Sequence, residues 1–191
     1  AEAQAQHWVA DTLRSWGWEV DVWTDDPQEY AEDPAFPGME VPRSSVTGVI
    51  GRPRGSRGSR LILGHTDVVQ GGPAPGFDGR TVYGRGSVDM KSGLVAGMHA
   101  ARTVGGDVAV CAVSGEEDGG IGTFLALAHG LRTQSCVIPE PTSLAIIPAN
   151  AGSLTFRLRL PGVSAHGARR WDGHNALEGR AEVMSDRKSV V

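Results

Sequence analysis

Three short apolar segments of the sequence are each followed at once by side chains that can bind metals or move protons. The segment 61–63 ("LIL") is followed by "GHTD", 108–113 ("VAVCAV") by "SGEED", and 136–138 ("CVI") by "PEPT". A further acid stands in "GRGSVDMKSG", where a glycine-rich stretch enters an expected helix. The candidate set is one imidazole and five carboxylates: His65, Asp67, Asp89, Glu116, Glu117 and Glu140.

The elements that must position these side chains follow from the apolar segments. Strands that are apolar on both faces belong to the middle of a sheet that helices cover on each side. The intervening segments "MKSGLVAGMHAARTV" and "FLALAHGL" predict those helices. We therefore expect an α/β domain with a mostly parallel sheet covered by helices on both faces. Ligands bind beyond the carboxyl ends of such strands, which lie about 5 Å apart, so the six side chains are expected to converge.

A cation is needed to hold so many acids together. Without one, the carboxylates would repel each other and most would stay protonated. Nitrogen and oxygen ligands without cysteine suit zinc, and also cobalt or manganese. A carboxylate such as Asp89 can bridge two metal ions about 3.5–4 Å apart, the spacing of two-metal hydrolytic sites.

The spacing within two of the motifs predicts a division of roles. Residues two apart on an extended chain point the same way, so Asp67 is placed to hold the second ring nitrogen of a metal-binding His65. The adjacent Glu116 and Glu117 project in different directions. We expect Glu117 to be a ligand and Glu116 to be the group that moves the proton.

The first forty residues predict scaffold only. The opening segment has helical spacing and ends at Gly17, 18–23 alternates as a strand, and 24–42 is expected to be a loop. Four tryptophans follow the periods of this helix and strand, which favours core packing over a ligand cage: Trp8, Trp16, Trp18 and Trp23.

Composition excludes several classes of function. The net charge of -4 argues against a nucleic-acid partner. The arginines of 51–60 ("GRPRGSRGSR") have no aromatic neighbours, so we expect a solvated connection between two strands. No apolar run approaches the ~20 residues that span a bilayer. Cys111 and Cys136 lie in apolar runs and are expected to be buried free thiols. We expect a cytoplasmic protein, although the chain does not begin with methionine.

The pattern changes near Asn150, where we place a domain boundary. The stretch 153–160 ("SLTFRLRL") alternates as a strand with one wet face, typical of an antiparallel sheet. The stretch 174–184 predicts the start of a helix capped by Asn175. The last six residues, 186–191 ("DRKSVV"), resemble the in-frame translation of a widely used sequencing adapter. We expect them to be a non-native tail that follows a gene fragment ending near residue 185.

Four ordered motifs resemble the metal-site motifs of the M20 family of metallopeptidases and deacylases: "GHTDVV", "GRGSVDMKSGLVAGMHA", "SGEEDGGIGT" and "PEPT". The resemblance runs from about Trp8 to about Met184. It implies two zinc ions, with His65 and Glu140 on one of them. Glu117 would bind the other zinc, and Asp89 would bridge both. Asp67 would orient His65, and Glu116 would be the general base.

The same resemblance implies a domain organisation. Residues 1–149 would be the N-terminal part of the catalytic domain, and 150–185 the beginning of an α+β lid and dimerisation domain. His166, in "SAHGA", matches a histidine that reaches the partner subunit's active site and helps to stabilise the oxyanion, which implies a homodimer. The family's remaining zinc ligand is a histidine near the C-terminus, before which this chain ends. We therefore expect an active parent enzyme and an inactive 191-residue chain.

The expected reaction is zinc-dependent hydrolysis of an amide bond in a small N-acyl amino acid. A carboxypeptidase or dipeptidase of the same family, acting on a short peptide, is the alternative within the enzyme class. A non-catalytic remnant is the alternative outside it, and the complete set of six side chains argues against a parent that has lost function. A dinucleotide site around "GRGSVD" is a weak alternative, because the spacing is not G-x-G-x-x-G and the preceding "FDGRTVY" does not form a buried first strand.

Overall fold

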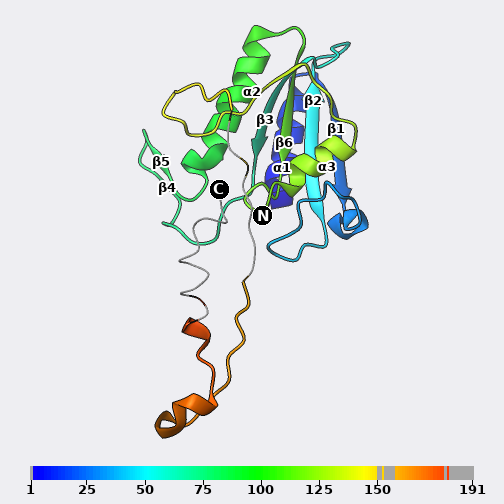
Figure 1. The fold of residues 1–191 in the computed structure, drawn as a ribbon. Helices are drawn as coiled ribbons and strands as arrows, with labels where there is room; N and C mark the ends of the chain where they lie inside the picture. Colours follow the sequence, from blue (N-terminus) through cyan, green and yellow to red (C-terminus); the bar gives the residue numbers. More distant parts are fainter. Residues whose placement is uncertain (1, 150–151, 153–157, 179, 181–191) are drawn as a thin grey trace. The chain divides into compact units, whose positions relative to one another are not determined.

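A computed structural model of the 191-residue chain describes residues 2–149, 152, 158–178 and 180. The contacts divide the chain into two units, Ala1–Asn150 and Ala151–Val191. The first unit carries the sheet and the helices that pack on it (Figure 1).

The first unit is built on a five-stranded sheet with the order β1-β2-β6-β3-β7. Its strands are β1 (Glu19–Asp25), β2 (Val46–Arg52), β3 (Arg60–His65), β6 (Val108–Val113) and β7 (Ser135–Val137). The β3 strand is parallel to both β6 and β7, whereas β2 is antiparallel to β1 and β6. Four of these five strands therefore run in one direction, and β2 makes the sheet mixed, with two parallel and two antiparallel pairings; the expected α/β class is confirmed. A separate two-stranded hairpin joins β4 (Gly76–Phe77) and β5 (Val82–Tyr83).

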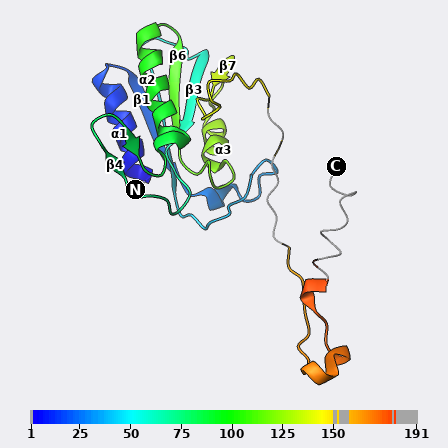
Figure 2. The ribbon, with the colours of Figure 1, turned by 90° about the vertical axis from the view of Figure 1, so that its left-hand side faces the viewer.

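Helices cover both faces of the sheet, as expected (Figure 2). Side chains of α1 (Glu2–Ser15) and α2 (Ser92–Val104) share one core with the sheet, and α3 (Ile121–Ala128) packs on the other face. Three short helical turns complete the described elements: η1 (Pro27–Tyr30), η2 (Ser87–Lys91) and η3 (Gly167–Asp172). No helix among the described residues is both long and apolar enough to cross a membrane.

The central strand β6 shows why an all-apolar segment predicts a doubly covered sheet. All six of its residues are buried. Val110 and Ala112 point into the core shared with α1 and α2, whereas Cys111 and Val113 point into the core shared with α3. Because successive side chains of a strand alternate between faces, both faces of β6 must be apolar.

Two expectations about burial are wrong. The segment 136–138 lies at the edge of the sheet, not in its middle, and all three residues of β7 are exposed. Cys136 is therefore an exposed free thiol, while Cys111 is buried as expected. The reason is that β7 pairs only with β3 among the strands that the structure describes.

One of the four tryptophans also departs from expectation. Trp23 on β1 is buried, and Trp16 and Trp18 are partly buried. Trp8 is 54% exposed, because the buried face of α1 is formed by residues on the other side of the helix. That buried face comprises Gln6, Val9, Ala10 and Leu13. The expectation of core packing is therefore wrong for Trp8.

The expectations beyond Asn150 are only partly covered by the described residues. Residues 153–157 of the expected strand lie outside them, and 158–160 have no regular structure. Asn175 Oδ1 accepts a hydrogen bond from the backbone N–H of Leu177 at 3.0 Å, and 176–178 are helical, as a cap at Asn175 requires. Residues 186–191, the expected non-native tail, lie outside the described residues.

Candidate metal centre

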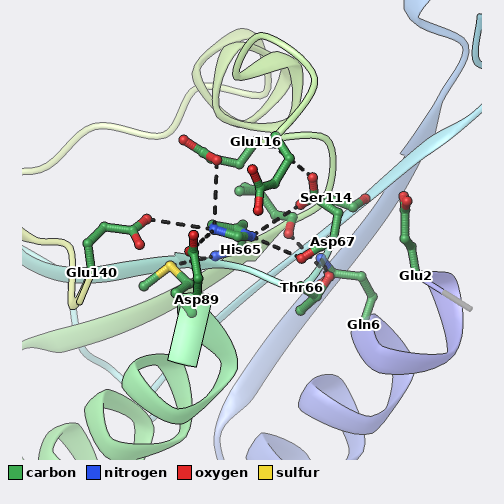
Figure 3. Close-up of polar contacts among 12 residues, drawn as sticks. Glu2, Gln6, His65, Thr66, Asp67, Asp89, Ser114, Glu116 and Glu140 are labelled. Atoms are coloured by element: carbon green, nitrogen blue, oxygen red, sulfur yellow. Dashed lines mark hydrogen bonds and ion pairs between the residues drawn. The ribbon is translucent and has the colours of Figure 1, made fainter. Parts of the chain in front are cut away.

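His65 stands at the carboxyl end of β3, where several segments of the first unit meet (Figure 3). The parallel register pairs His65 with Val113, the last residue of β6, so the turn that follows β6 comes beside the imidazole. On the other side, β3 pairs with β7, and the chain after β7 brings Glu140 to the same place. The side chain of His65 is only 1% exposed.

The imidazole Nε2 atom of His65 faces three carboxylates from three different segments. It lies 3.3 Å from Asp89 Oδ1. It also lies 3.7 Å from Glu116 Oε2 and 3.7 Å from Glu140 Oε1. Three of the five sequence-predicted carboxylates therefore converge on one nitrogen atom, although they come from the segments after β6 and β7 and from η2.

Three of the residues offer ligand atoms close enough to share one ion. One such atom each from His65, Asp89 and Glu117 lies within 4.8 Å of the other two. The donor set is one imidazole nitrogen with carboxylate oxygens, which suits zinc and other divalent transition metals. The surplus of carboxylates over cationic groups around Nε2 also fits a bound cation. The residues present therefore fit the expected metal ion.

The second ring nitrogen of His65 faces Asp67, which is also 1% exposed. Nδ1 lies 3.2 Å from the backbone oxygen of Asp67 and 3.5 Å from its carboxylate Oδ1. The main-chain oxygen is the closer acceptor, and the carboxylate acts on the ring through its contact and its charge. Asp67 Oδ2 accepts a hydrogen bond from the backbone N–H of Glu117 at 3.0 Å. Asp67 thus links the strand that carries His65 to the turn that carries Glu117.

The charges at this cluster shift several pKa values. Burial lowers the pKa of His65, but the contact with Asp67 and the charges of Asp67, Glu116 and Glu140 outweigh it and raise the pKa to about 9. Burial raises the pKa of Glu116, and it raises that of Glu140 in the same way. Burial also acts to raise the pKa of Asp67, yet its contacts with His65 and the backbone of Glu117 hold that pKa below the ordinary value.

Some residues that shape the centre were not found from the sequence. The backbone N–H of His65 lies 3.2 Å from the Met90 sulfur, which is fully buried. Thr66, between the two predicted residues, accepts a hydrogen bond from Gln6 Nε2 at 2.9 Å. Gln6 is fully buried on α1, 60 positions away, so a helical spacing that predicted an apolar face gave no sign of this contact.

The third acid of "GEED", Asp118, anchors the turn that bears Glu116 and Glu117. It is 3% exposed and accepts hydrogen bonds from the backbone N–H groups of Glu40 and Val41 at 2.6 and 3.0 Å. Arg43 donates to its other oxygen at 2.7 Å. Asp118 therefore ties the long segment before β2 to this turn. The sequence carried no signal for the pairing, because the partners lie more than 70 positions away.

Two glycines allow helices to approach the strands that carry the acids. A Cβ atom at Gly93, in the first turn of α2, would collide with the backbone oxygen of Pro139, the residue before Glu140. A Cβ atom at Gly122 in α3 would collide with the backbone oxygen of Ser114. These close approaches bring the α2 start, which follows Asp89, against the segment that presents Glu140.

His166 belongs to the second unit. Its backbone is extended, and its Nδ1 atom accepts a hydrogen bond from the backbone N–H of Ala168 at 3.2 Å, at the start of η3. The side chain is exposed. Its predicted role at a partner's active site stays a prediction.

Comparisons with known proteins identify the family of this chain. The family model of Peptidase family M20/M25/M40 matches residues 61–182. A succinyl-diaminopimelate desuccinylase of Aromatoleum aromaticum is 32% identical over 176 residues, covering 78% of this chain and 46% of the relative. The Bordetella petrii enzyme of the same name is 31% identical over 182 residues, covering 81% and 48%.

A solved structure, human carnosine dipeptidase 1, is 20% identical with a TM-score of 0.40, covering 69% of this chain and 31% of that one. This chain spans about half the length of the curated relatives it matches. The family match extends over more than half of the chain and includes all of the clustered acids and His65. The chain therefore belongs to Peptidase family M20/M25/M40.

Proposed function

We propose that the whole protein is a zinc-dependent hydrolase that cleaves the amide bond of a small N-acyl amino acid. The observation that carries this proposal is the convergence on His65 Nε2 of carboxylates from Asp89, Glu116 and Glu140, at 3.3–3.7 Å. A divalent metal ion would offset the repulsion among these carboxylates, and carboxylates with one imidazole are the ligands that such an ion binds.

In this proposal His65 and Glu140 would hold one zinc ion, Glu117 would hold a second, and Asp89 would be shared between them. The spread of ligand atoms in His65, Asp89 and Glu117, within 4.8 Å, supports a shared site. We propose that two ions bind, and that they are zinc and not cobalt or manganese. When bound, the metal supplies Lewis acidity, which polarises the amide carbonyl and lowers the pKa of water.

Glu116 is proposed to move the proton. Its side chain is 46% exposed, so the carboxylate is open to water while one oxygen lies 3.7 Å from His65 Nε2. Burial raises its pKa towards the range in which a carboxylate accepts and returns a proton efficiently. Glu116 would accept the proton of the attacking water and pass it to the departing amine. Asp67 would keep His65 in place throughout.

The substrate, partner and location are further parts of the proposal. The names of the similar desuccinylases favour a deacylase over the carboxypeptidase or dipeptidase alternative. Residues 1–149 would form the N-terminal part of the catalytic domain, and 150–185 the beginning of the lid. A homodimer would bring His166 to the partner's active site. The free thiols of Cys111 and Cys136 support a reducing compartment such as the cytoplasm.

The test is hydrolysis by the complete gene product loaded with zinc, with the 191-residue chain assayed beside it. N-succinyl and N-acetyl amino acids are compared with dipeptides as substrates. We expect acyl amino acids to be cleaved and a chelator to stop the reaction. Cleavage of dipeptides alone would support the carboxypeptidase or dipeptidase alternative. The proposal is overturned if neither class of substrate is hydrolysed in a metal-dependent reaction.

A further inference from the structure

A hollow of about 370 Å³ lies beside the candidate metal centre. Asp89 and Glu117, two of the proposed ligands, form part of its wall. The rest of the wall comes from the segment after β3, which contributes Val69, and from the stretch before α2, which contributes Arg85 and Val88. A molecule with its reacting group at the metal centre would therefore place its other end among these side chains.

Arg85 is held in position by the opposite loop of the hollow. Its Nε donates a hydrogen bond to the backbone oxygen of Gly71 at 3.0 Å. The side chain also lies so close to Gly72 that a Cβ atom there would be 2.9 Å from Nε, and Gly72 has a φ of 111°. Glycine at this position thus leaves room for the arginine. The Nε atom of this exposed guanidinium is thus tied to the loop at Gly71.

The two terminal nitrogens of Arg85 have no hydrogen-bond or ion-pair partner among the residues that the structure describes. Among the described residues that line the hollow, Arg85 is the one cationic side chain. A guanidinium anchored through Nε presents its remaining N–H groups as a planar fork, which matches the two oxygens of a carboxylate.

Exposed apolar side chains line the same hollow as Arg85. Val69 is 42% exposed and Val88 is 66% exposed, and both line the hollow. Apolar walls with a few oriented polar groups are typical of small-molecule sites. The combination fits a short hydrocarbon chain that ends in a carboxylate.

We propose that Arg85 binds a carboxylate of the substrate and thereby selects acidic N-acyl amino acids over neutral amides. This inference rests on the proposed function, because it places the scissile amide at the neighbouring metal centre. The carboxylate belongs either to the acyl group or to the amino acid. Arg85 would recognise a carboxylate from either part of the substrate, and probes that carry the carboxylate on one side only separate the two cases.

The test is an NMR titration of the ¹⁵N-labelled 191-residue chain with three probes, with and without zinc. N-methylsuccinamate carries a carboxylate on the acyl side, N-acetylglycine carries one on the amino-acid side, and N-acetylglycinamide carries none. We expect at least one carboxylate probe to shift the Arg85 Nε–H signal and to bind about tenfold more weakly to Arg85→Gln. N-acetylglycinamide should bind both proteins equally.

Two further variants keep the result interpretable. Arg80→Gln removes an exposed arginine of the neighbouring hairpin that does not line the hollow, and its affinity should match the wild type. Arg85→Lys keeps the charge but loses the planar fork, and should bind the carboxylate probe with intermediate affinity. The inference is overturned if neither carboxylate probe binds, if Arg85→Gln binds as well as the wild type, or if Arg80→Gln weakens binding equally.

Zinc binding is measured separately on the same samples. Arg85→Gln should retain the zinc affinity of the wild type, because Arg85 is not a proposed ligand. Wild-type protein that binds the carboxylate through Arg85 but takes up no zinc would count against the proposed function alone. Zinc uptake without any effect of Arg85→Gln would count against this inference alone.

Discussion

The Nδ1 atom of His65 lies closer to the backbone oxygen of Asp67 than to its carboxylate, at 3.2 Å against 3.5 Å. The main chain of Asp67 can therefore fix the tautomer of the ring, while the buried carboxylate adds charge and holds the backbone N–H of Glu117. One residue thus acts on two proposed metal ligands at once.

Asp67→Asn separates these two contributions. The backbone oxygen that faces Nδ1 remains, but the negative charge beside the ring is lost, so we expect zinc affinity to fall by about tenfold with the site still formed. A competition titration with a zinc indicator measures this change. Asp21→Asn, at an exposed position of β1, is the control and should bind zinc like the wild type. Unchanged affinity in Asp67→Asn would show that the carboxylate has no influence on the metal centre.

The raised pKa of His65 predicts a pH dependence of the metal-free chain. Its pKa is 6.5 in an unfolded chain and about 9 when folded. Protonation of His65 therefore stabilises the fold fully below pH 6.5, and this contribution is lost as the pH rises through 9. Urea unfolding at several pH values should show a fall in stability across this window, and His65→Gln should lack it. An equal fall in His65→Gln would assign the effect to other groups.

Zinc binding must displace the same proton. Between pH 6.5 and 9 we expect at most one proton to leave His65 when it binds its zinc ion, whether or not a second zinc ion binds at Glu117, because only the neutral imidazole is a ligand. Calorimetry in buffers of different ionisation enthalpy measures the number of protons released. Release that does not change when His65 is replaced by Gln would contradict the assignment of His65 as a ligand.

Glu116 and Glu117 are adjacent and have the same charge, which makes them a matched pair of variants. In the complete gene product, Glu116→Gln should keep zinc but lose activity by about 10²–10⁴-fold, because no group then moves the proton. Glu117→Gln should lose zinc, since Glu117 offers a ligand atom to the group formed with His65 and Asp89. Zinc analysis and turnover are measured together. The opposite pattern, with zinc lost in Glu116→Gln, would mean that the two roles are exchanged.

Asp118 provides a stability prediction that does not depend on metal. Asp118→Ala leaves Arg43 and two backbone N–H groups without their buried acceptor, so we expect a loss of about 3 kcal/mol in the free energy of unfolding. Asp33→Ala is the control, because exposed Asp33 accepts a single backbone hydrogen bond from Ala35. It should cost about 1 kcal/mol or less. Equal losses in the two variants would show that the Asp118 network adds nothing beyond one ordinary contact.

Gly93→Ala tests the close approach of α2 to the segment that presents Glu140. Alanine favours a helix over glycine, so propensity alone predicts a gain of about 1 kcal/mol. We expect a loss of stability and of zinc affinity instead, because the new Cβ would meet the backbone oxygen of Pro139. Ser92→Ala, at the exposed neighbouring position, is the control. A Gly93→Ala protein with higher stability and unchanged zinc binding would refute the steric argument.

Sequence patterns predicted the parts of the fold that local composition determines. The all-apolar segment 108–113 predicted a doubly covered strand, and β6 is one. The helices expected over 90–104 and 124–131 are present as α2 (Ser92–Val104) and as α3 (Ile121–Ala128), which begins three residues earlier than expected. Strand β2 has two glycines within seven residues and no long apolar run, so its bounds are not predicted, although the connection expected at 51–60 implies a strand before it.

The remaining differences arise from contacts between distant positions. Whether 136–138 is a central or an edge strand depends on what pairs beyond it, which its own sequence does not encode. Asp118 resembles any solvated acid until the segment that contains Arg43 folds onto it. Five of the six candidate side chains are found because they follow apolar segments that are individually predictable, and the parallel register then brings the ends of these segments together. Asp89 is found instead from the glycine-rich stretch before α2.

X-ray absorption at the zinc edge of the 191-residue chain tests the central claim most directly. We predict a shell of nitrogen and oxygen atoms at about 2.0–2.2 Å, with the multiple scattering of one imidazole that disappears in His65→Gln. Sulfur at about 2.3 Å, zinc that binds equally well without His65, or no bound zinc would contradict the metal centre that we assign to His65, Asp89, Glu117 and Glu140.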